Sequence, residues 1–269
     1  GAEMSEQMNM IVDSLDRLFV DLAARDQQMP ESWQMIEDMG VCDLLLDETE
    51  GGMGAGWADA EPALRLLGLR AITLPIGETM IARRLLSQAG LPIPSGPLPL
   101  STDALPDIRP ERIVALGAFL RTAQIAGALS AALDMTIEYA KIRSQFGREL
   151  RKFQAIQQQI AVLSEEVAAI ASASASAALA IDKGSGQFAI ACAKLRANQA
   201  AGAGALIAHQ VHGAIGITAE YSLHRFTNGL WQWRSDFGND RYWAEWIGRR
   251  VLAEDAGTPW SILTKESLA

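Results

Sequence analysis

The sequence has few of the residues that usually build metal centres or disulfide frameworks. Only two cysteines, Cys42 and Cys192, occur in 269 residues, and their separation matches no metal-binding or redox spacing. We therefore expect two reduced, buried thiols in a cytoplasmic protein. The three histidines, His209, His212 and His224, fall within sixteen residues, but a zinc site would need more ligands and supporting hydrogen bonds. We predict no metal site.

Long apolar runs and an excess of basic residues are also absent. No run of about 18 continuous apolar residues occurs, so we expect no membrane-spanning helix. We also expect no signal peptide. The formal net charge is −9, whereas nucleic-acid and membrane-surface binders usually carry a basic patch. With 49% apolar and 20% charged residues, the composition is that of an ordinary soluble globular protein.

Alternation of apolar and polar residues, the pattern of β-strands, is almost missing, and helical periodicity dominates. The periodicity predicts helices over about 11–22, 31–39, 58–69, 77–90, 119–146, 153–181, 186–214, 222–238 and 240–255. Six of the ten prolines lie in residues 91–110, where they remove backbone donors and interrupt helices. We predict an all-α chain, with an N-terminal helical domain (4–90), an irregular connector (91–115) and a C-terminal up-and-down bundle (116–255).

Two stretches allow both a structural and a ligand-binding interpretation. The glycine-rich run 51–56 lacks the Lys-Ser/Thr of a phosphate-binding loop, and no strand precedes it, so we interpret it as a structural turn. The stretch 230–246 holds four of the seven tryptophans. Since tryptophan is favoured in protein interfaces, a core or subunit-interface patch is the preferred interpretation, and a wall beside a flat aromatic ligand is the alternative.

Three stretches resemble the acyl-CoA dehydrogenase family. "YAKIRSQFGRELRKFQAIQQQIA" (139–161) is similar to its Y-x-x-x-R-x-Q-F-G-x-x-x-x-x-F-Q-x-x-Q run. "HQVHGAIGITAEYSLHR" (209–225) resembles its Q-x-x-G-G-x-G-Y-T-x-E-Y run, with Ala214 in place of the second glycine. Residues 33–68 match an N-terminal pattern of the family more loosely, with Asp47 where proline is usual. The resemblance covers most of the chain.

The resemblance implies FAD as cofactor and an acyl-CoA thioester as substrate. In this family the arginine of the Q-F-G run reaches across a subunit interface to the FAD of the neighbouring chain. A guanidinium suits a pyrophosphate because its planar fork of donors can pair two oxygens at once. The implied cofactor contacts are Arg143, Gln145, Phe146, Gly147, Phe153, Gln154, Gln210, Val211, His212 and Gly213.

Two parts of a complete family member are missing. The family has a β-domain of roughly a hundred residues between its helical parts, but only the proline-rich connector stands there in this chain. The family's catalytic base is a glutamate near the end of the penultimate helix, and that position falls near Asp236. Because a base must lie within hydrogen-bond reach of its proton, the shorter aspartate is favoured as a helix-end residue over a catalytic base.

The resemblance and its gaps together predict one subunit of a heteromeric acyl-CoA dehydrogenase. Such a subunit would contribute FAD contacts to a full-length homologue, which would hold the substrate and the base. An electron-transfer flavoprotein or a similar protein would accept the electrons. The alternatives are a self-sufficient homo-oligomeric dehydrogenase that uses Asp236, and a helical scaffold that binds no flavin.

Overall fold

The computed structural model describes residues 2–24, 27, 31–253 and 258. Nine helices lie in these ranges: α1 (Ala2–Ala24), α2 (Glu31–Asp38), α3 (Trp57–Leu69), α4 (Ile76–Gln88), α5 (Pro110–Ile142), α6 (Gln154–Asp182), α7 (Gln187–His212), α8 (Leu223–Ser235) and α9 (Asp240–Leu252). Four 3₁₀ turns join them: η1 (Val41–Asp43), η2 (Glu48–Glu50), η3 (Leu150–Lys152) and η4 (Gly213–Ile217). The described residues contain one strand pair, β1 (Ser144–Gln145) and β2 (Arg148–Glu149). The all-α prediction is therefore confirmed.

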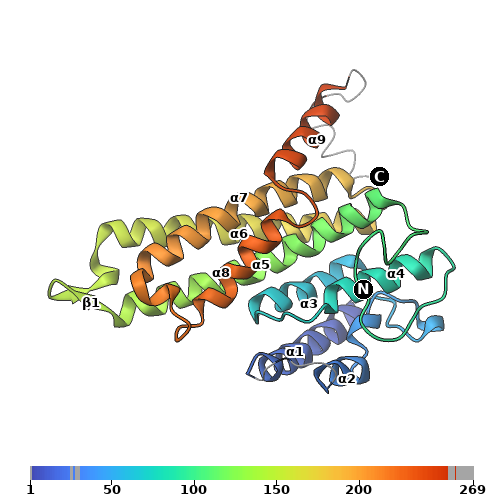
Figure 1. Cartoon of the computed structure of the whole chain (residues 1–269), viewed down its shortest axis with the longest axis horizontal. Coiled ribbons are helices and arrows are strands. Elements are labelled where there is room, and N and C mark those ends of the chain that lie inside the picture. Colours follow the sequence, from blue (N-terminus) through green and yellow to red (C-terminus); the bar gives the residue numbers. More distant parts are fainter. Residues whose placement is uncertain (1, 25–26, 28–30, 254–257, 259–269) are drawn as a thin grey trace.

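The helices form an elongated bundle with a second layer at one end (Figure 1). Helices α5 to α8 run along the long axis, and α1 to α4 pack beside the half of α5 that is farther from the strand pair. Helix α9 projects from the bundle near the end of α8. Helix α5 is long because it serves both layers: at 33 residues it contacts α3 as well as α6, α7 and α8.

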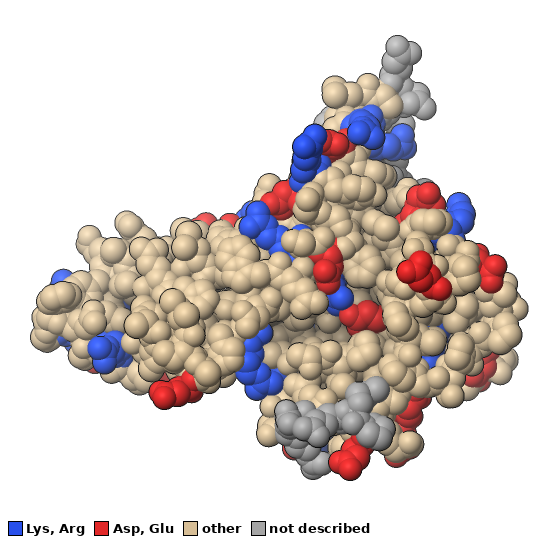
Figure 2. Space-filling model, in the orientation of Figure 1, with Lys and Arg blue, Asp and Glu red and all other residues tan. Residues whose placement is uncertain are grey.

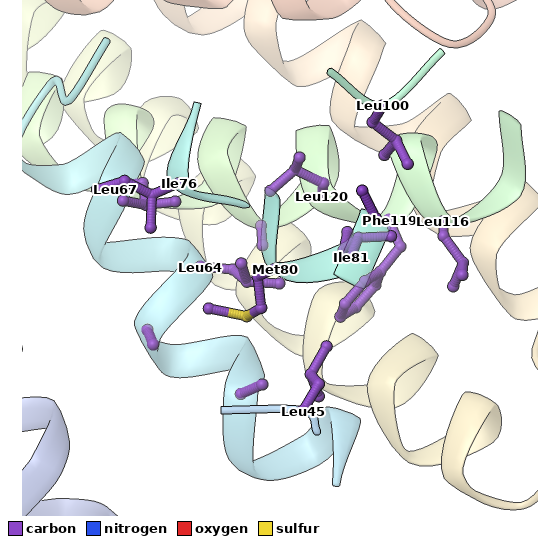
Figure 3. Close-up of a cluster of buried hydrophobic side chains, with 14 of the residues drawn as sticks. Leu45, Leu64, Leu67, Ile76, Met80, Ile81, Leu100, Leu116, Phe119 and Leu120 are labelled. Atoms are coloured by element: carbon purple, nitrogen blue, oxygen red, sulfur yellow. The ribbon is translucent and has the colours of Figure 1, made fainter. Parts of the chain in front are cut away.

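One apolar core joins the N-terminal helices to α5 (Figure 3). Phe119 of α5 is fully buried, and its ring meets the Trp57 ring of α3 edge-on at 5.8 Å between centroids. The connector contributes Leu100, Leu105 and Ile108 to the same core. Burying these three side chains stabilises the connector despite its prolines, since each buried leucine or isoleucine contributes about 1.5–3 kcal/mol.

Helices α5 and α6 are both long and apolar enough to cross a membrane by length and composition alone. In α5, 89% of the most apolar window is buried inside the molecule, as expected of a core helix. In α6 only 22% of that window is buried. Helix α6 therefore turns an apolar, Ala- and Ser-rich face outward.

Two glycines allow α3 and α5 to cross with their backbones in contact. A Cβ on Gly68 would lie 1.9 Å from the carbonyl oxygen of Gln124, and a Cβ on Gly127 would lie 2.0 Å from that of Arg65. Neither approach is compatible with a side chain. The close crossing therefore depends on glycine at both positions.

The substitution Gly127→Ala is expected to lower the free energy of unfolding by about 1–3 kcal/mol, because the backbones must move apart. The matched control is Gly248→Ala in α9, where an added Cβ meets nothing within 4 Å. That change should be neutral or stabilising by up to about 1 kcal/mol, since alanine is the better helix former. Chemical denaturation of both variants measures the difference, and equal losses would contradict the close crossing.

Several predicted boundaries need correction. Helix α5 begins at Pro110, inside the stretch predicted as connector, because proline is well suited to the first turn of a helix. The same helix ends at Ile142, although the sequence predicted it to continue to Phe146. Helix α8 ends at Ser235, three residues before the predicted end at Gly238. Residues 254 and 255 of the last predicted helix lie outside the described residues.

The other structural predictions have mixed outcomes. Cys42 is buried as expected, whereas Cys192 is only partly buried. The glycine-rich stretch is a local turn, in which the amides of Gly52 and Gly54 bond to the carbonyls of Asp47 and Leu46. In the tryptophan-rich stretch, Trp233 and Trp243 belong to the core, while Trp231 is 48% exposed. An interface role for this stretch stays a prediction.

Candidate functional site

The Q-F-G run forms a tight β-hairpin at one end of the bundle (Figure 1). Ser144 pairs with Glu149 and Gln145 with Arg148, so Phe146 and Gly147 form a two-residue turn. Both turn residues have positive φ, 51° and 77°, as a hairpin of this length requires. Glycine adopts this conformation freely, but for phenylalanine it is strained. Strain of this kind is found preferentially at functional sites.

The hairpin presents its side chains outward, at an end of the bundle whose visible face carries few charged residues (Figure 2). Phe146 is 91% exposed and the neighbouring Ile142 is 77% exposed, which is unusual for large apolar residues. Arg143 is exposed, and within the described residues its side chain has no hydrogen bond or ion pair. The two carboxylates nearest in sequence are already paired, Glu138 with Lys141 and Glu149 with Arg151. Arg143 therefore offers an uncommitted guanidinium beside an exposed aromatic ring.

The second motif lies at the same end of the bundle and is packed against the first. The His212 ring stacks on the Tyr139 ring with centroids 4.6 Å apart. Val211 packs with Leu150 and Ala140 in a small apolar cluster. These contacts fix the position of the hairpin relative to the end of α7.

Burial divides the ten implied cofactor contacts into three groups. Seven are exposed: Arg143, Gln145, Phe146, Gly147, Gln154, Gln210 and Gly213. Phe153 is half-buried, and the Arg148 guanidinium lies 4.0 Å from the centre of its ring. Val211 and His212 are buried within the chain. Their side chains therefore position the site, and only the exposed group can touch a cofactor held by another chain.

His212 is fixed in one orientation and one tautomer. Its Nδ1 donates to the carbonyl oxygen of Ala208 at 2.7 Å, and its Nε2 accepts from the Tyr221 hydroxyl at 3.2 Å. Burial lowers the pKa of His212, so the ring stays neutral near pH 7. Burial likewise lowers the pKa of His209, whose Nε2 lies 3.0 Å from the Thr227 hydroxyl. Both histidines are thus satisfied within the fold.

Asp236 lies far from the hairpin, at the end of α8, and is held by an ion pair. Its Oδ2 accepts from Nε of Arg121 at 3.0 Å. Nη1 of the same arginine bonds to Glu78 and Gln124, at 2.7 Å in each case. Arg121 is 7% exposed. The carboxylate at the position of the family's base is therefore committed to a buried cation.

A buried lysine, Lys194 of α7, holds the loop that follows Asp236. Its Nζ donates to Asn198 Oδ1 at 2.5 Å and to the carbonyls of Trp233 and Gly238 at 2.9 and 3.3 Å. Phe237 in this loop adopts a positive φ of 53°. Lys194 thus satisfies carbonyls at the end of α8 that have no partner within the helix.

Burial lowers the pKa of Lys194 to about 7, well below its value in an unfolded chain. Between pH 7 and about 10 the unfolded chain then binds more protons than the folded one, so stability rises with pH. We expect the wild-type free energy of unfolding to rise, relative to that of Lys194→Met, by up to about 1.4 kcal/mol per pH unit. Denaturation of both proteins at several pH values measures this. Parallel curves would contradict a lowered pKa.

Sequence analysis did not identify Arg121, Glu78 or Lys194. A usable signal existed for Arg121, which is the only charged residue between Arg112 and Asp134 of an apolar helix. Such a charge is almost always paired when the helix is buried. Its partners could not be inferred, because Asp236 is 115 residues away.

Comparison with known sequences shows the family to which this chain belongs. Residues 111–252 match the sequence model of the family described as "Acyl-CoA dehydrogenase, C-terminal domain". Acyl-CoA dehydrogenase IpdE2 of Mycobacterium tuberculosis is 37% identical over 109 residues, which span 40% of this chain but only 33% of that protein. IpdE2 of Mycolicibacterium smegmatis is 28% identical over 253 residues, covering 73% of this chain and 80% of that protein.

Solved structures share the fold at lower identity. A chain of the Tcur3481-Tcur3483 steroid ACAD G363A variant superposes with a TM-score of 0.79 at 17% identity, covering 91% of this chain and 97% of that one. A chain of the ChsE4-ChsE5 complex from Mycobacterium tuberculosis superposes with a TM-score of 0.74 at 18% identity, covering 94% and 97%. These chains therefore share the helical fold of this chain over most of its length.

Proposed function

Because this chain belongs to the acyl-CoA dehydrogenase family, we propose that it is one subunit of a flavin-dependent acyl-CoA dehydrogenase that contributes FAD contacts to a full-length partner. The observation that carries the proposal is the hairpin at residues 144–149. It combines a strained, exposed Phe146 with an exposed Arg143 that has no protein partner among the described residues. A molecule that covers the hairpin would shield the Phe146 ring from water and give the Arg143 guanidinium a partner.

The exposed residues fit one side of a dinucleotide. The Arg143 guanidinium can pair two pyrophosphate oxygens, and the amides of Gln145 and Gln210 offer further donors. Phe146 offers a flat apolar surface for a ring. When bound, FAD would accept a hydride while a base removes the α-proton of the thioester. Within the described residues, the proposed contacts lie on the hairpin, the start of α6 and the end of α7, which supports a partner that holds the rest of the cofactor.

The state of Asp236 supports a division of labour between the two subunits. A general base must have a carboxylate free to reach its proton, whereas the carboxylate of Asp236 is bound to Arg121 at 3.0 Å. The same pairing weighs against a self-sufficient homo-oligomer that uses Asp236. The ChsE4-ChsE5 structure is a complex of two proteins, and we propose an assembly of the same kind here. An electron-transfer flavoprotein as acceptor and a cytoplasmic location are parts of the same proposal.

The proposal is tested by co-expressing the chain with candidate full-length homologues and measuring co-purification and dehydrogenase activity. In the active complex, Asp236→Asn should leave turnover within about twofold, since asparagine can still accept from Arg121. Loss of a true general base costs about 10²–10⁴-fold, so a loss of that size would contradict a non-catalytic role. If no homologue co-purifies with the chain, the heteromer itself is wrong.

A further inference from the structure

Three helices begin around one cavity of about 290 Å³. Trp57 is the first residue of α3, Arg112 lies in the first turn of α5, and Gln187 is the first residue of α7. All three line the cavity, and none of the candidate FAD contacts does. Arg112 and the hairpin lie at opposite ends of α5 (Figure 1), about 45 Å apart along the helix. The cavity is therefore separate from the candidate FAD site.

The cavity contains a guanidinium that has no anionic partner in the described chain. Arg112 is half-buried, and its Nη2 donates to the neutral Gln88 Oε1 at 2.6 Å. Within the described residues neither Arg112 nor the neighbouring Arg109 forms an ion pair, and Glu111 is exposed and pairs with neither. Burial lowers the pKa of Arg112, and the charge of Arg109 lowers it further.

The position of Arg112 on its helix is also unfavourable for a cation. The first turn of a helix carries the positive end of the helix dipole, which favours anions. The nearby carboxylate of Asp182 is committed to another helix start, because it accepts from the amides of Trp57 and Ala58 at 2.7 and 2.9 Å. The positive charge of Arg112 is therefore left uncompensated by the described residues around it.

The walls of the cavity are largely apolar and include one more unpaired donor. Leu116 of α5 and Ile190 of α7 are buried residues that line it. Trp57 is 7% exposed, and in the described part of the chain its indole Nε1 makes no hydrogen bond. A buried tryptophan usually finds a partner for this N–H. An acceptor on a ligand in the cavity would supply one.

We propose that this cavity binds a small organic carboxylate, whose apolar ring or chain packs against Leu116 and Ile190 and whose oxygens accept from Arg112 and Trp57. A guanidinium suits a carboxylate because its planar fork of donors matches two oxygens. Inorganic phosphate would leave the apolar walls uncovered, and a neutral ligand would leave the charge of Arg112 uncompensated. The site does not depend on the proposed function, since neither FAD nor acyl-CoA takes part in it.

Calorimetry of the full chain with benzoate tests the assignment, because benzoate joins a carboxylate to a flat apolar ring. We expect saturable binding, with an affinity at least about tenfold higher than that of benzyl alcohol or of inorganic phosphate. Arg112→Gln should lower the affinity for benzoate about tenfold, through loss of a charge-assisted hydrogen bond. Trp57→Phe keeps an aromatic ring but removes the N–H, and should lower it about threefold.

The matched control is Arg17→Gln in α1, an exposed arginine that has no ion pair among the described residues and does not line the cavity. It should leave the affinity for benzoate unchanged. Because a cation is unfavourable at a helix start, Arg112→Gln should not lower the midpoint of denaturation. Absence of saturable benzoate binding, equal affinity for benzyl alcohol, or unchanged benzoate affinity in Arg112→Gln would overturn the assignment.

Discussion

Replacing Arg143 with alanine is expected to weaken FAD binding by the assembled complex about ten- to a hundredfold. The guanidinium is exposed, and in the described part of the chain it has no ion pair. All of its hydrogen-bond donors are therefore available to a bound phosphate. A charge-assisted hydrogen bond contributes about 1.5–3 kcal/mol, which corresponds to the stated change in affinity. Arg143→Lys should recover only part of the loss, because lysine keeps the charge but lacks the bidentate geometry.

The control for Arg143 is Lys141→Ala. Lys141 is an exposed cation two residues away that is already paired with Glu138 at 2.6 Å. Its removal should leave FAD affinity within about twofold, since an exposed ion pair contributes little. Flavin release from the purified complex, followed by fluorescence, measures both variants. Unchanged affinity in Arg143→Ala, with assembly intact, would remove this residue from the cofactor site.

The largest expected effect on stability comes from Arg121→Ala. Arg121 is buried between Glu78 and Asp236, whose side chains are 16% and 30% exposed. Without the arginine, two largely buried carboxylates would lose the cation that they share. Breaking a buried pair costs about 3–5 kcal/mol, and we expect the lower end because Asp236 is partly solvated.

Arg84→Ala is the matched control for this prediction. Arg84 pairs with Asp47 at 3.3 Å, but the Asp47 side chain is 65% exposed. Removing this arginine should cost less than about 1 kcal/mol. Denaturant unfolding of the two variants gives the comparison directly. Similar losses in both would mean that Arg121 does not hold the loop at Asp236.

The sequence predicted the helices well where apolar periodicity is long, and poorly where elements are short. Strands of two residues, such as Ser144–Gln145, are too short to show alternation, so helical periodicity extends the predicted helix into the hairpin. The run of prolines places Pro110 in the predicted connector, although its lack of an N–H is harmless at a helix start. In both cases the local pattern fits two structures, and tertiary packing selects one.

The candidate site could be located from the sequence, but which of its residues are exposed and which are buried could not be predicted. The two motifs lie together as the resemblance implied, through the Tyr139–His212 stack. That Val211 and His212 face inward depends on helix α5, more than sixty residues earlier in the chain. Similarly, the commitment of Asp236 depends on Arg121, at a separation of 115 residues. Pairings at such distances follow from the folded arrangement and leave no local trace.

We propose that this subunit contributes to its partner's FAD site. The flavin stoichiometry of the purified proteins tests this most directly. Absorbance of released flavin, set against protein content, gives the number of FAD molecules per chain. We expect no stoichiometric FAD on this chain purified alone, and one FAD for each pair of this chain and its full-length partner. A full complement of FAD on the isolated chain, or two FAD molecules per pair, would contradict the account.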